Sequence, residues 1–320
     1  MIYFVLLLLS FTLTYLIKNY AIKKSLVAEV NERSSHSVPT PHGGGIAIAV
    51  TWFVGLGWFY FTDAIDEQLF YALSAGATIA IVSFLDDLYE LSPKVRLITQ
   101  ALVAGLGLYF LGGLREIDFG LFSITNQLVT NGFAFLLIVW FINLYNFLDG
   151  INGYAGSEAL FLSLAGFTLF GGGHFLVLAV AVLGFLYWNF GNAKIFMGDV
   201  GSTMLGYTVA VFTLYYANIE SINLWVWIIL FGVFWFDATV TLVRRKLNGE
   251  KLSQAHKKHA YQRLTQAGWS HSKVTLYTLG LNIIIFLLVF LVPNIAISFG
   301  LSLILLYGAM KFVDSKKQFI

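Results

Sequence analysis

The stretch NLYNFLDGINGYAG, residues 143–156, places one carboxylate and two amides at the end of a long apolar segment. Asn143, Asn146 and Asp149 recur at intervals of three, so on a helix their side chains share one face. A charge on an otherwise apolar helix needs a partner, because burying it unpaired is costly. The glycines that follow indicate a turn. The stretch predicts a membrane helix that ends in a polar site.

The composition of the whole chain is that of an integral membrane protein. Of its 320 residues, 58% are hydrophobic and only 11% are charged, whereas roughly a quarter are charged in soluble globular proteins. The sequence contains no cysteine, which excludes disulfides, thiolate metal sites and a cysteine nucleophile. No basic residue precedes the apolar residues 2–17, which favours a first spanning helix over a cleaved signal peptide.

Apolar segments recur along the chain at lengths near the roughly 20 residues that a helix needs to cross a bilayer. We expect eleven spans, at 2–17, 43–61, 68–85, 96–113, 128–146, 157–171, 174–190, 201–217, 222–241, 274–292 and 296–312. The sequence predicts a single all-α membrane domain over 1–320 with a cytoplasmic-face catalytic cleft. Its cytoplasmic loops are expected at about 18–42, 86–96, 147–156, 191–200 and 244–273.

The charged residues predict an orientation. With the N-terminus outside and the C-terminus in the cytoplasm, every lysine and arginine except Arg115 falls on the cytoplasmic side, as the positive-inside rule requires. Five acids then fall at the cytoplasmic ends of spans: Asp86, Asp87, Asp149, Asp199 and Asp237. We expect them to converge at one membrane surface.

The stretch FLDDLYELSPKVRLITQ, residues 84–100, ends one span and begins the next. Asp86 and Asp87 fall at a helix C-terminus, whose partial negative charge repels carboxylates unless a cation lies near. Lys94 and Arg96 follow in the same short loop. A solvated loop with ordinary salt bridges is the structural alternative.

The stretch NAKIFMGDVGS, residues 192–202, places Asp199 close to two glycines. Gly198 and Gly201 would allow the backbone to approach a ligand closely, and Lys194 supplies a nearby cation. The alternative is that Asp199 only caps the following helix.

The loop after the ninth span is strongly basic. Its candidate residues are Arg244, Arg245, His256, Lys257, Lys258 and His259. Binding of anionic lipid headgroups would explain the basic residues, but not the two histidines three positions apart, which suit phosphate hydrogen bonding or metal ligation. His42, beside the glycines in NERSSHSVPTPHGGG (31–45), belongs to a further basic stretch.

Together these motifs predict phosphoryl transfer at the membrane surface. Carboxylate and amide oxygens suit Mg²⁺, which usually keeps substrate phosphates among its ligands, and basic side chains suit phosphate oxygens. An ion-coupled transporter is the rival from another class, because acids in membranes also mark ion pathways. It predicts acids near span midpoints and repeated halves, and the sequence shows neither. No feature indicates nucleic-acid binding.

The four motifs, in this order, resemble the polyprenyl-phosphate N-acetylhexosamine-1-phosphate transferases, glycosyltransferase family 4. The resemblance implies transfer of a sugar 1-phosphate from a UDP-sugar to undecaprenyl phosphate, with release of UMP. It implies Asp199 as a Mg²⁺ ligand, with Asn146 or Asn143 as a second. The catalytic residues would be Asp86, Asp87, Asp149, His256 and His259. The substrate-binding residues would be Asn143, Asn146, Lys94, Arg96, Lys194, Arg244, Arg245, Lys257, Lys258 and His42.

Within that family, RSSHSVPTPHGGG and AHKKHAYQRL resemble the branch that starts bacterial O-antigen or capsule-type glycans. The branch favours a 6-deoxy N-acetylhexosamine, with UDP-N-acetylglucosamine as the alternative donor. We expect Mg²⁺, with Mn²⁺ as a substitute, in a multi-pass protein of the bacterial inner membrane. Direct attack by the lipid phosphate and a covalent aspartyl-phosphate both remain open, as does a homodimer.

Overall fold

The computed structural model describes residues 1–24, 27–28, 40–252, 254 and 256–319, and almost all of their regular structure is helical. The helices are α1 (Ile2–Lys23), α2 (Gly45–Phe61), α3 (Glu67–Ser74), α4 (Gly76–Tyr89), α5 (Pro93–Leu111), α6 (Gln127–Leu148), α7 (Tyr154–Phe170), α8 (Gly173–Asn189), α9 (Asp199–Ile219), α10 (Asn223–Leu230), α11 (Gly232–Leu247), α12 (Ala260–Gln266), α13 (His271–Leu291) and α14 (Ile295–Lys316). Residues 33 and 36 of the basic stretch lie outside the described residues.

Two short antiparallel strand pairs qualify the prediction of an all-α fold. Strand β1 (Val27–Ala28) pairs with β2 (Thr40–Pro41), and β3 (Ile117–Asp118) pairs with β4 (Ser123–Ile124). Each strand has only two residues. The protein is therefore a helical bundle with two small extensions.

Every predicted span contains helix. Among the described residues, six helical segments are long and apolar enough to cross a membrane, namely α1, α3 with α4, α5, α6, α13 and α14. The bent pair α10 and α11 makes a seventh if it counts as one span, while α2, α7 and α8 are apolar but only 17 residues long. The structure supports a multi-pass membrane protein, and eleven crossings stay a prediction.

The predicted span 222–241 is not one continuous helix. It consists of α10 and the start of α11, which meet at an angle of 72°. The break falls at Phe231 and Gly232, and glycine is a weak helix former. The Phe231 ring is fully buried and packs edge-on against Phe141, which holds the chain in its bent course.

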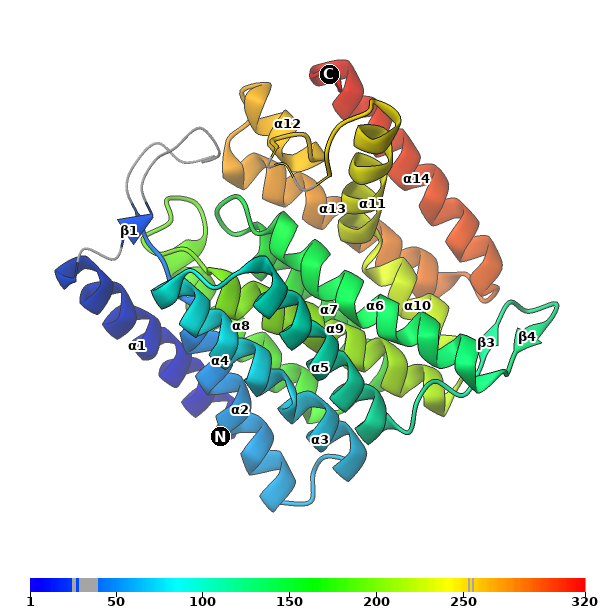
Figure 1. Ribbon diagram of the computed structural model, residues 1–320, viewed down its shortest axis with the longest axis horizontal. Helices are drawn as coiled ribbons and strands as arrows, with labels where there is room; N and C mark the ends of the chain where they lie inside the picture. The colour runs from blue at the N-terminus through cyan, green and yellow to red at the C-terminus, as the bar shows by residue number, and fades with distance from the viewer. Residues whose placement is uncertain (25–26, 29–39, 253, 255, 320) are drawn as a thin grey trace.

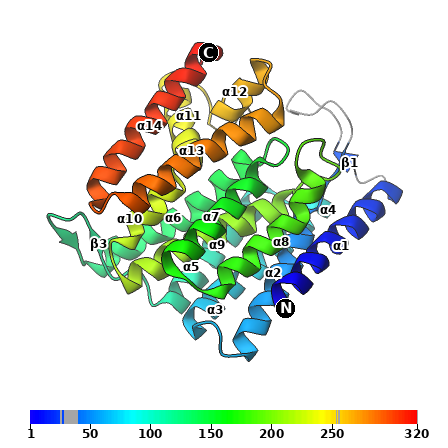
Figure 2. The same cartoon turned by 180° about the vertical axis from the view of Figure 1, so that it is seen from behind.

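The two chain termini lie at opposite ends of the bundle (Figure 1). The N-terminus of α1 lies toward the same end as the loop between α2 and α3, whereas the C-terminus of α14 lies near α12. The reverse view shows the same arrangement, with β3 and α12 at opposite ends (Figure 2). This geometry agrees with an odd number of crossings.

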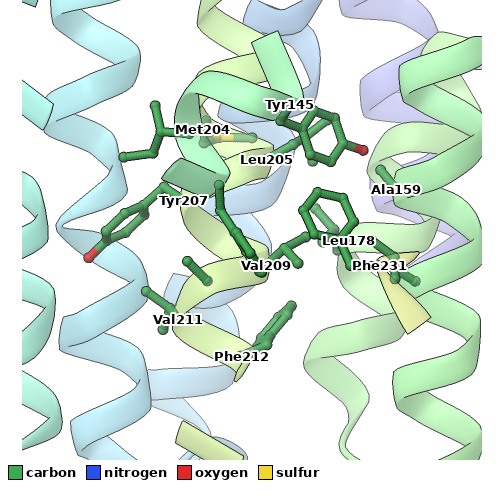
Figure 3. Close-up of a cluster of buried hydrophobic side chains, with 14 of the residues drawn as sticks. Tyr145, Ala159, Leu178, Met204, Leu205, Tyr207, Val209, Val211, Phe212 and Phe231 are labelled. Carbon is green, nitrogen blue, oxygen red and sulfur yellow. The ribbon is translucent and has the colours of Figure 1, made fainter. Parts of the chain in front are cut away.

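Helix α9 forms the centre of the bundle, and most of its residues are buried. It packs against α6, α4, α2 and α10. Gly206 brings it close to α6, since a Cβ there would lie 2.5 Å from the carbonyl oxygen of Phe141 and 2.9 Å from Cα of Ile142. Small residues permit such close approach between membrane helices. Figure 3 shows the surrounding apolar core, including Tyr145 from α6 and Phe212 from α9. The close contact of Gly206 with the α6 backbone fixes the ends of α6 and α9 relative to each other.

Candidate active site

Three carboxylates meet where α4 and α6 end and α9 begins. Asp199 is the first residue of α9, Asp149 directly follows α6, and Asp87 lies near the end of α4. The charge of Asp199 acts on both Asp87 and Asp149. Of the five acids expected to converge, these three lie together in the fold, whereas Asp86 and Asp237 have other partners.

The environment of Asp149 disfavours its negative charge. Loss of solvent, followed by repulsion from Asp199, raises the pKa of Asp149 to about 7, although a hydrogen bond from the Gly198 backbone acts in the opposite direction. Carboxylates gathered in this way repel one another. A cation placed among them would relieve that repulsion, so the cluster is suited to bind one.

Asp86 and Asp87 occupy different environments, although they are neighbours. The Asp86 carboxylate accepts a hydrogen bond of 2.7 Å from the backbone N–H of Leu91 and lies 3.4 Å from Arg96. Asp87 instead faces the start of α9, where a Cβ on Gly198 would lie 3.8 Å from its Oδ2. Asp86 thus holds the turn between α4 and α5, whereas Asp87 belongs to the acid cluster.

The glycines after His42 bring the start of α2 against the start of α9. The backbone N–H of Gly45 donates to the carbonyl of Met197 at 2.9 Å. A Cβ on Gly45 would lie 2.5 Å from Cα of Gly201 and closer still to its nitrogen. This contact places His42 within range of Asp199. Burial lowers the pKa of His42, and the charge of Asp199 partly offsets that effect.

A cavity of about 330 Å³ adjoins the acid cluster. It lies between α4, α5, α6 and α9, so helices distant in sequence contribute to one wall. Its lining residues are Ile79, Val82, Ser83, Pro93, Arg96, Leu97, Thr99, Gln100, Asn143, Asn146, Phe147, Asp199 and Thr203. The sequence analysis had singled out four of these, Arg96, Asn143, Asn146 and Asp199.

The two amides of α6 are held in place by polar partners. Asn143 donates to Oε1 of Gln100 at 2.7 Å, and Asn146 donates to Oγ of Ser202 at 3.0 Å. Because its nitrogen contacts Ser202, Asn146 keeps its oxygen as an acceptor. Gln100 was not among the predicted site residues, because a single uncharged amide inside a span is a weaker signal than a charge.

Two arginines of the basic loop are engaged in ion pairs within the fold. Arg244 forms two hydrogen bonds to Asp314, of 2.9 and 3.0 Å. Arg245 is buried and binds Glu250 at 3.0 Å, together with backbone carbonyls of the loop that follows. Neither lines the cavity beside the acids. Arg244 thus joins α11 to α14 and Arg245 supports the loop that follows, and their role in substrate binding stays a prediction.

The candidate lysines also lie in unlike surroundings. Lys258 pairs with Glu250 at 2.7 Å, and Lys194 lies over the ring of Trp188 at 5.5 Å. Lys94 is exposed in the first turn of α5, and Lys257 is half-buried in the loop before α12. Among the cations predicted to bind substrate, Arg96 is the one that lines the cavity.

The two histidines of the basic loop lie side by side at the edge of the site. The ring centroids of His256 and His259 are 4.8 Å apart. His259 is buried, and its ring stacks toward Phe147, a cavity-lining residue, at 6.4 Å. Tyr261 donates to the carbonyl of Phe147 at 3.1 Å, which attaches the loop to the end of α6.

The donor set determines what kind of metal ion the site fits. Within the described part of the chain, no three His, Asp or Glu side chains are close enough to form a metal cage. Mg²⁺ commonly takes only one or two carboxylates and completes its shell with water and substrate phosphates. The Asp199 carboxylate and the Asn146 oxygen are donors of this kind, and both residues line the cavity; a shared Mg²⁺ stays a prediction.

Comparison with known proteins agrees with these features. Residues 69–217 match the family model Glycosyl transferase family 4. The chain is 33% identical over 285 residues to a probable undecaprenyl-phosphate N-acetylglucosaminyl 1-phosphate transferase of Bacillus subtilis, covering 84% of this chain and 78% of the relative. It is 29% identical over 308 residues to a decaprenyl-phosphate N-acetylglucosaminephosphotransferase of Mycobacterium tuberculosis, covering 81% and 74%.

A third relative is an undecaprenyl-phosphate alpha-N-acetylglucosaminyl 1-phosphate transferase of Yersinia pestis, 28% identical over 284 residues, with 82% of this chain and 76% of the relative covered. The matches extend well beyond the acid motifs to most of the chain. The membrane bundle, the acid cluster and these similarities lead to one conclusion: the chain belongs to the polyprenyl-phosphate N-acetylhexosamine-1-phosphate transferase family.

Proposed function

We propose that this protein transfers an N-acetylhexosamine 1-phosphate from a UDP-sugar to undecaprenyl phosphate at the cytoplasmic face of a bacterial inner membrane. The observation that carries the proposal is the cluster of Asp87, Asp149 and Asp199 beside a cavity that Arg96 and Asn146 help to line, at one end of a membrane bundle. The names of the relatives support N-acetylglucosamine as the first sugar to test. They give no support to the expected 6-deoxy sugar or O-antigen role.

The reaction needs little acid–base chemistry. A phosphate monoester has a second pKa near 6, so at pH 7 the lipid phosphate is mostly a dianion. Its oxygen attacks the sugar-linked phosphorus of the donor, a P–O bond forms, and the bond from that phosphorus to the bridging oxygen breaks. UMP leaves with the bridging oxygen and its electron pair. The total charge is unchanged, and no proton is consumed.

The main barrier is repulsion between two anionic reactants, so stabilising charge is the principal task of the site. Asp199 and Asn146 would hold Mg²⁺, which supplies positive charge and orients phosphate oxygens. Arg96 lines the cavity and offers a guanidinium to a phosphate. Asp87 completes the anionic side of the ion site, and Asp86 maintains the turn that carries Arg96.

An apolar groove of about 570 Å³ lies between α2, α4 and α9 and offers a place for the first isoprene units. Val200, which lines it, directly follows Asp199, and Phe84 lies three residues before Asp87. The groove thus runs from the acids along the lipid-facing side of the bundle. Ala80→Phe should narrow it and raise the KM for the lipid while leaving the KM for the UDP-sugar unchanged.

Purified protein with undecaprenyl phosphate and a panel of UDP-N-acetyl sugars tests the proposal. Release of UMP and formation of a lipid-linked sugar should both require a divalent ion, and Asp199→Asn should abolish both. Exchange of labelled UMP into the UDP-sugar without lipid would favour a covalent aspartyl intermediate over direct attack. If no UDP-sugar in the panel gave UMP, the proposed activity would be wrong.

A further inference from the structure

Asp237, on α11, is a buried acid for which the proposed reaction has given no role. Asp237 is 4% exposed, and the neighbouring His259 is 3% exposed. Tyr261 lies within electrostatic range of both Asp237 and Asp149, so Asp237 is near the acid cluster. Asp237 itself faces His259 and Ala260. A buried carboxylate is costly unless it is paired or hydrogen-bonded. Its partners therefore indicate its role.

Most contacts of the Asp237 carboxylate are to the segment that carries His259. Both carboxylate oxygens accept the backbone N–H of Ala260, at 2.8 and 2.9 Å. Thr241, one turn along α11, donates to Oδ1 at 3.1 Å. Nδ1 of His259 lies 3.5 Å from the same oxygen. Asp237 therefore fixes the backbone next to His259 and faces the imidazole ring itself.

This arrangement selects one protonation pattern for His259. An ionised carboxylate can only accept hydrogen bonds, so a ring nitrogen facing it is favoured when it carries a proton. In that tautomer the Nδ1 proton is on the side of Asp237, at 3.5 Å from Oδ1, although Nδ1 makes no hydrogen bond among the described residues. Nε2 is the nitrogen left for another partner. The ring lies between Phe147 and Tyr261, at centroid distances of 6.4 and 6.0 Å, and Phe147 lines the cavity.

His256 has the opposite pattern. Its Nδ1 accepts the backbone N–H of Lys258 at 3.2 Å, so its proton is on Nε2. Burial, and then the charge of His259, lowers the pKa of His256 to about 4. Two imidazoles 4.8 Å apart do not both carry charge easily. Asp237 faces His259, whereas the backbone of Lys258 faces His256, so the two rings have different neighbours at Nδ1.

We propose that Asp237 is a positioning residue that places a proton on Nδ1 of His259, so that the site presents two unlike histidines to a diphosphate. The inference rests on the proposed function for the identity of that ligand. His256 is a neutral donor through Nε2–H. His259, with the Asp237 carboxylate 3.5 Å behind its Nδ1, leaves Nε2 for a partner in the site.

A purely structural role for Asp237 is the competing explanation, because its hydrogen bonds also hold the start of α12. The variant Asp237→Asn separates the two roles. Its oxygen can still accept from Ala260, but its amide would donate to His259 and reverse the preferred tautomer. Asp237→Ser, whose hydroxyl can also accept from Ala260, is the second variant if the first does not fold. Thr241→Val is the matched control, since it removes a hydrogen bond to Asp237 and keeps the carboxylate.

The first measurement is turnover of the purified full-length protein with UDP-N-acetylglucosamine and undecaprenyl phosphate. We expect Asp237→Asn to lower kcat at least tenfold with an unchanged unfolding temperature, and Thr241→Val to keep the wild-type kcat. The double variant Asp237→Asn with His259→Asn should lower kcat no more than the single variant with the larger effect, because the effects of residues that act as a unit are not additive. A wild-type kcat in Asp237→Asn, or effects that multiply, would overturn the proposal.

The second measurement does not need turnover and separates this inference from the proposed function. Nitrogen chemical shifts of ¹⁵N-histidine-labelled protein distinguish the tautomers, and His256→Asn and His259→Asn assign the two signals. We expect a protonated Nδ1 on His259, a protonated Nε2 on His256, and a shift of His259 toward Nε2–H in Asp237→Asn. A wild-type His259 protonated only on Nε2 would overturn the inference whether or not UMP is released.

Discussion

The contact between Gly45 and Gly201 leads to a prediction about how the site is assembled. In Gly45→Ala the new Cβ would lie 2.5 Å from Cα of Gly201 and still closer to its nitrogen. Carbon atoms in favourable contact are about 3.5–4.0 Å apart, so the shortfall is roughly 1 Å. Both opposing atoms are backbone, and no side-chain rotation can relieve the overlap. The start of α9, which carries Asp199, must therefore move.

The expected cost has two components. Adding a methyl group to a tightly packed contact typically costs about 1–3 kcal/mol, which should lower the unfolding temperature by a few degrees. A displacement of about 1 Å at a catalytic group can reduce the rate about a hundredfold. We therefore expect Gly45→Ala to remain folded in detergent but to lose most of its UMP release.

Two further variants make this test specific. Gly57→Ala lies on the same helix, where an added Cβ would meet nothing within 4 Å, and it should keep wild-type stability and turnover. Gly201→Ala repeats the perturbation from the other side, with its Cβ 2.8 Å from Cα of Gly45. Thermal unfolding and UMP release are measured for all three. If Gly45→Ala behaved like Gly57→Ala, the glycine contact would not be what positions Asp199.

Three further predictions concern other parts of the site. Asp87→Asn should abolish turnover without loss of stability, since it removes repulsion within the cluster. Asp86→Ala should lower the unfolding temperature and reduce turnover less, because Asp86 holds the turn after α4. The reverse order of the two effects would refute the assigned roles. Arg245→Ala should lower the unfolding temperature, because the carbonyls of Lys251 and Gln254 lose their buried donor while Glu250 keeps only its pair with Lys258. Limited proteolysis of the loop, with the exposed Lys246→Ala as control, should show faster cleavage only for the arginine variant. Because the pKa of His256 is lowered, its contribution to stability is full above pH 6.5 and is lost as the pH falls toward 4. The unfolding temperature of His256→Gln should therefore depend less on pH across that interval. A pH dependence equal to that of the wild type would contradict this.

Local patterns in the sequence determined much of the fold. Each expected apolar span contains a helix, and turn-forming residues between the spans predicted several turns. Gly171 and Gly172 both adopt positive φ angles, 70° and 85°, in the predicted turn between α7 and α8. Asn294 caps α14 after the predicted turn at 292–294. These signals work because backbone conformation at glycine and helix caps depends mainly on nearby residues.

The acids of the site were also visible in the sequence, because a charge at the end of an apolar helix is conspicuous whatever the tertiary fold. Asp87, Asp149 and Asp199 do interact, as their common location at one membrane surface predicted. Gln100 escaped notice because a single amide within a span carries no such signal. Its importance depends on α5 lying against α6.

Tertiary structure alone decided how similar residues divide their roles. Asp86 and Asp87 are adjacent and identical in chemistry, yet one holds a turn and the other faces Asp199. The sequence did not show that Arg245 binds Glu250 and a carbonyl of the loop that follows it. The sequence records which charges are present near a surface. Which charge meets which depends on helix packing, because electrostatic and hydrogen-bond partners are set by distances of a few ångströms between segments far apart in the chain.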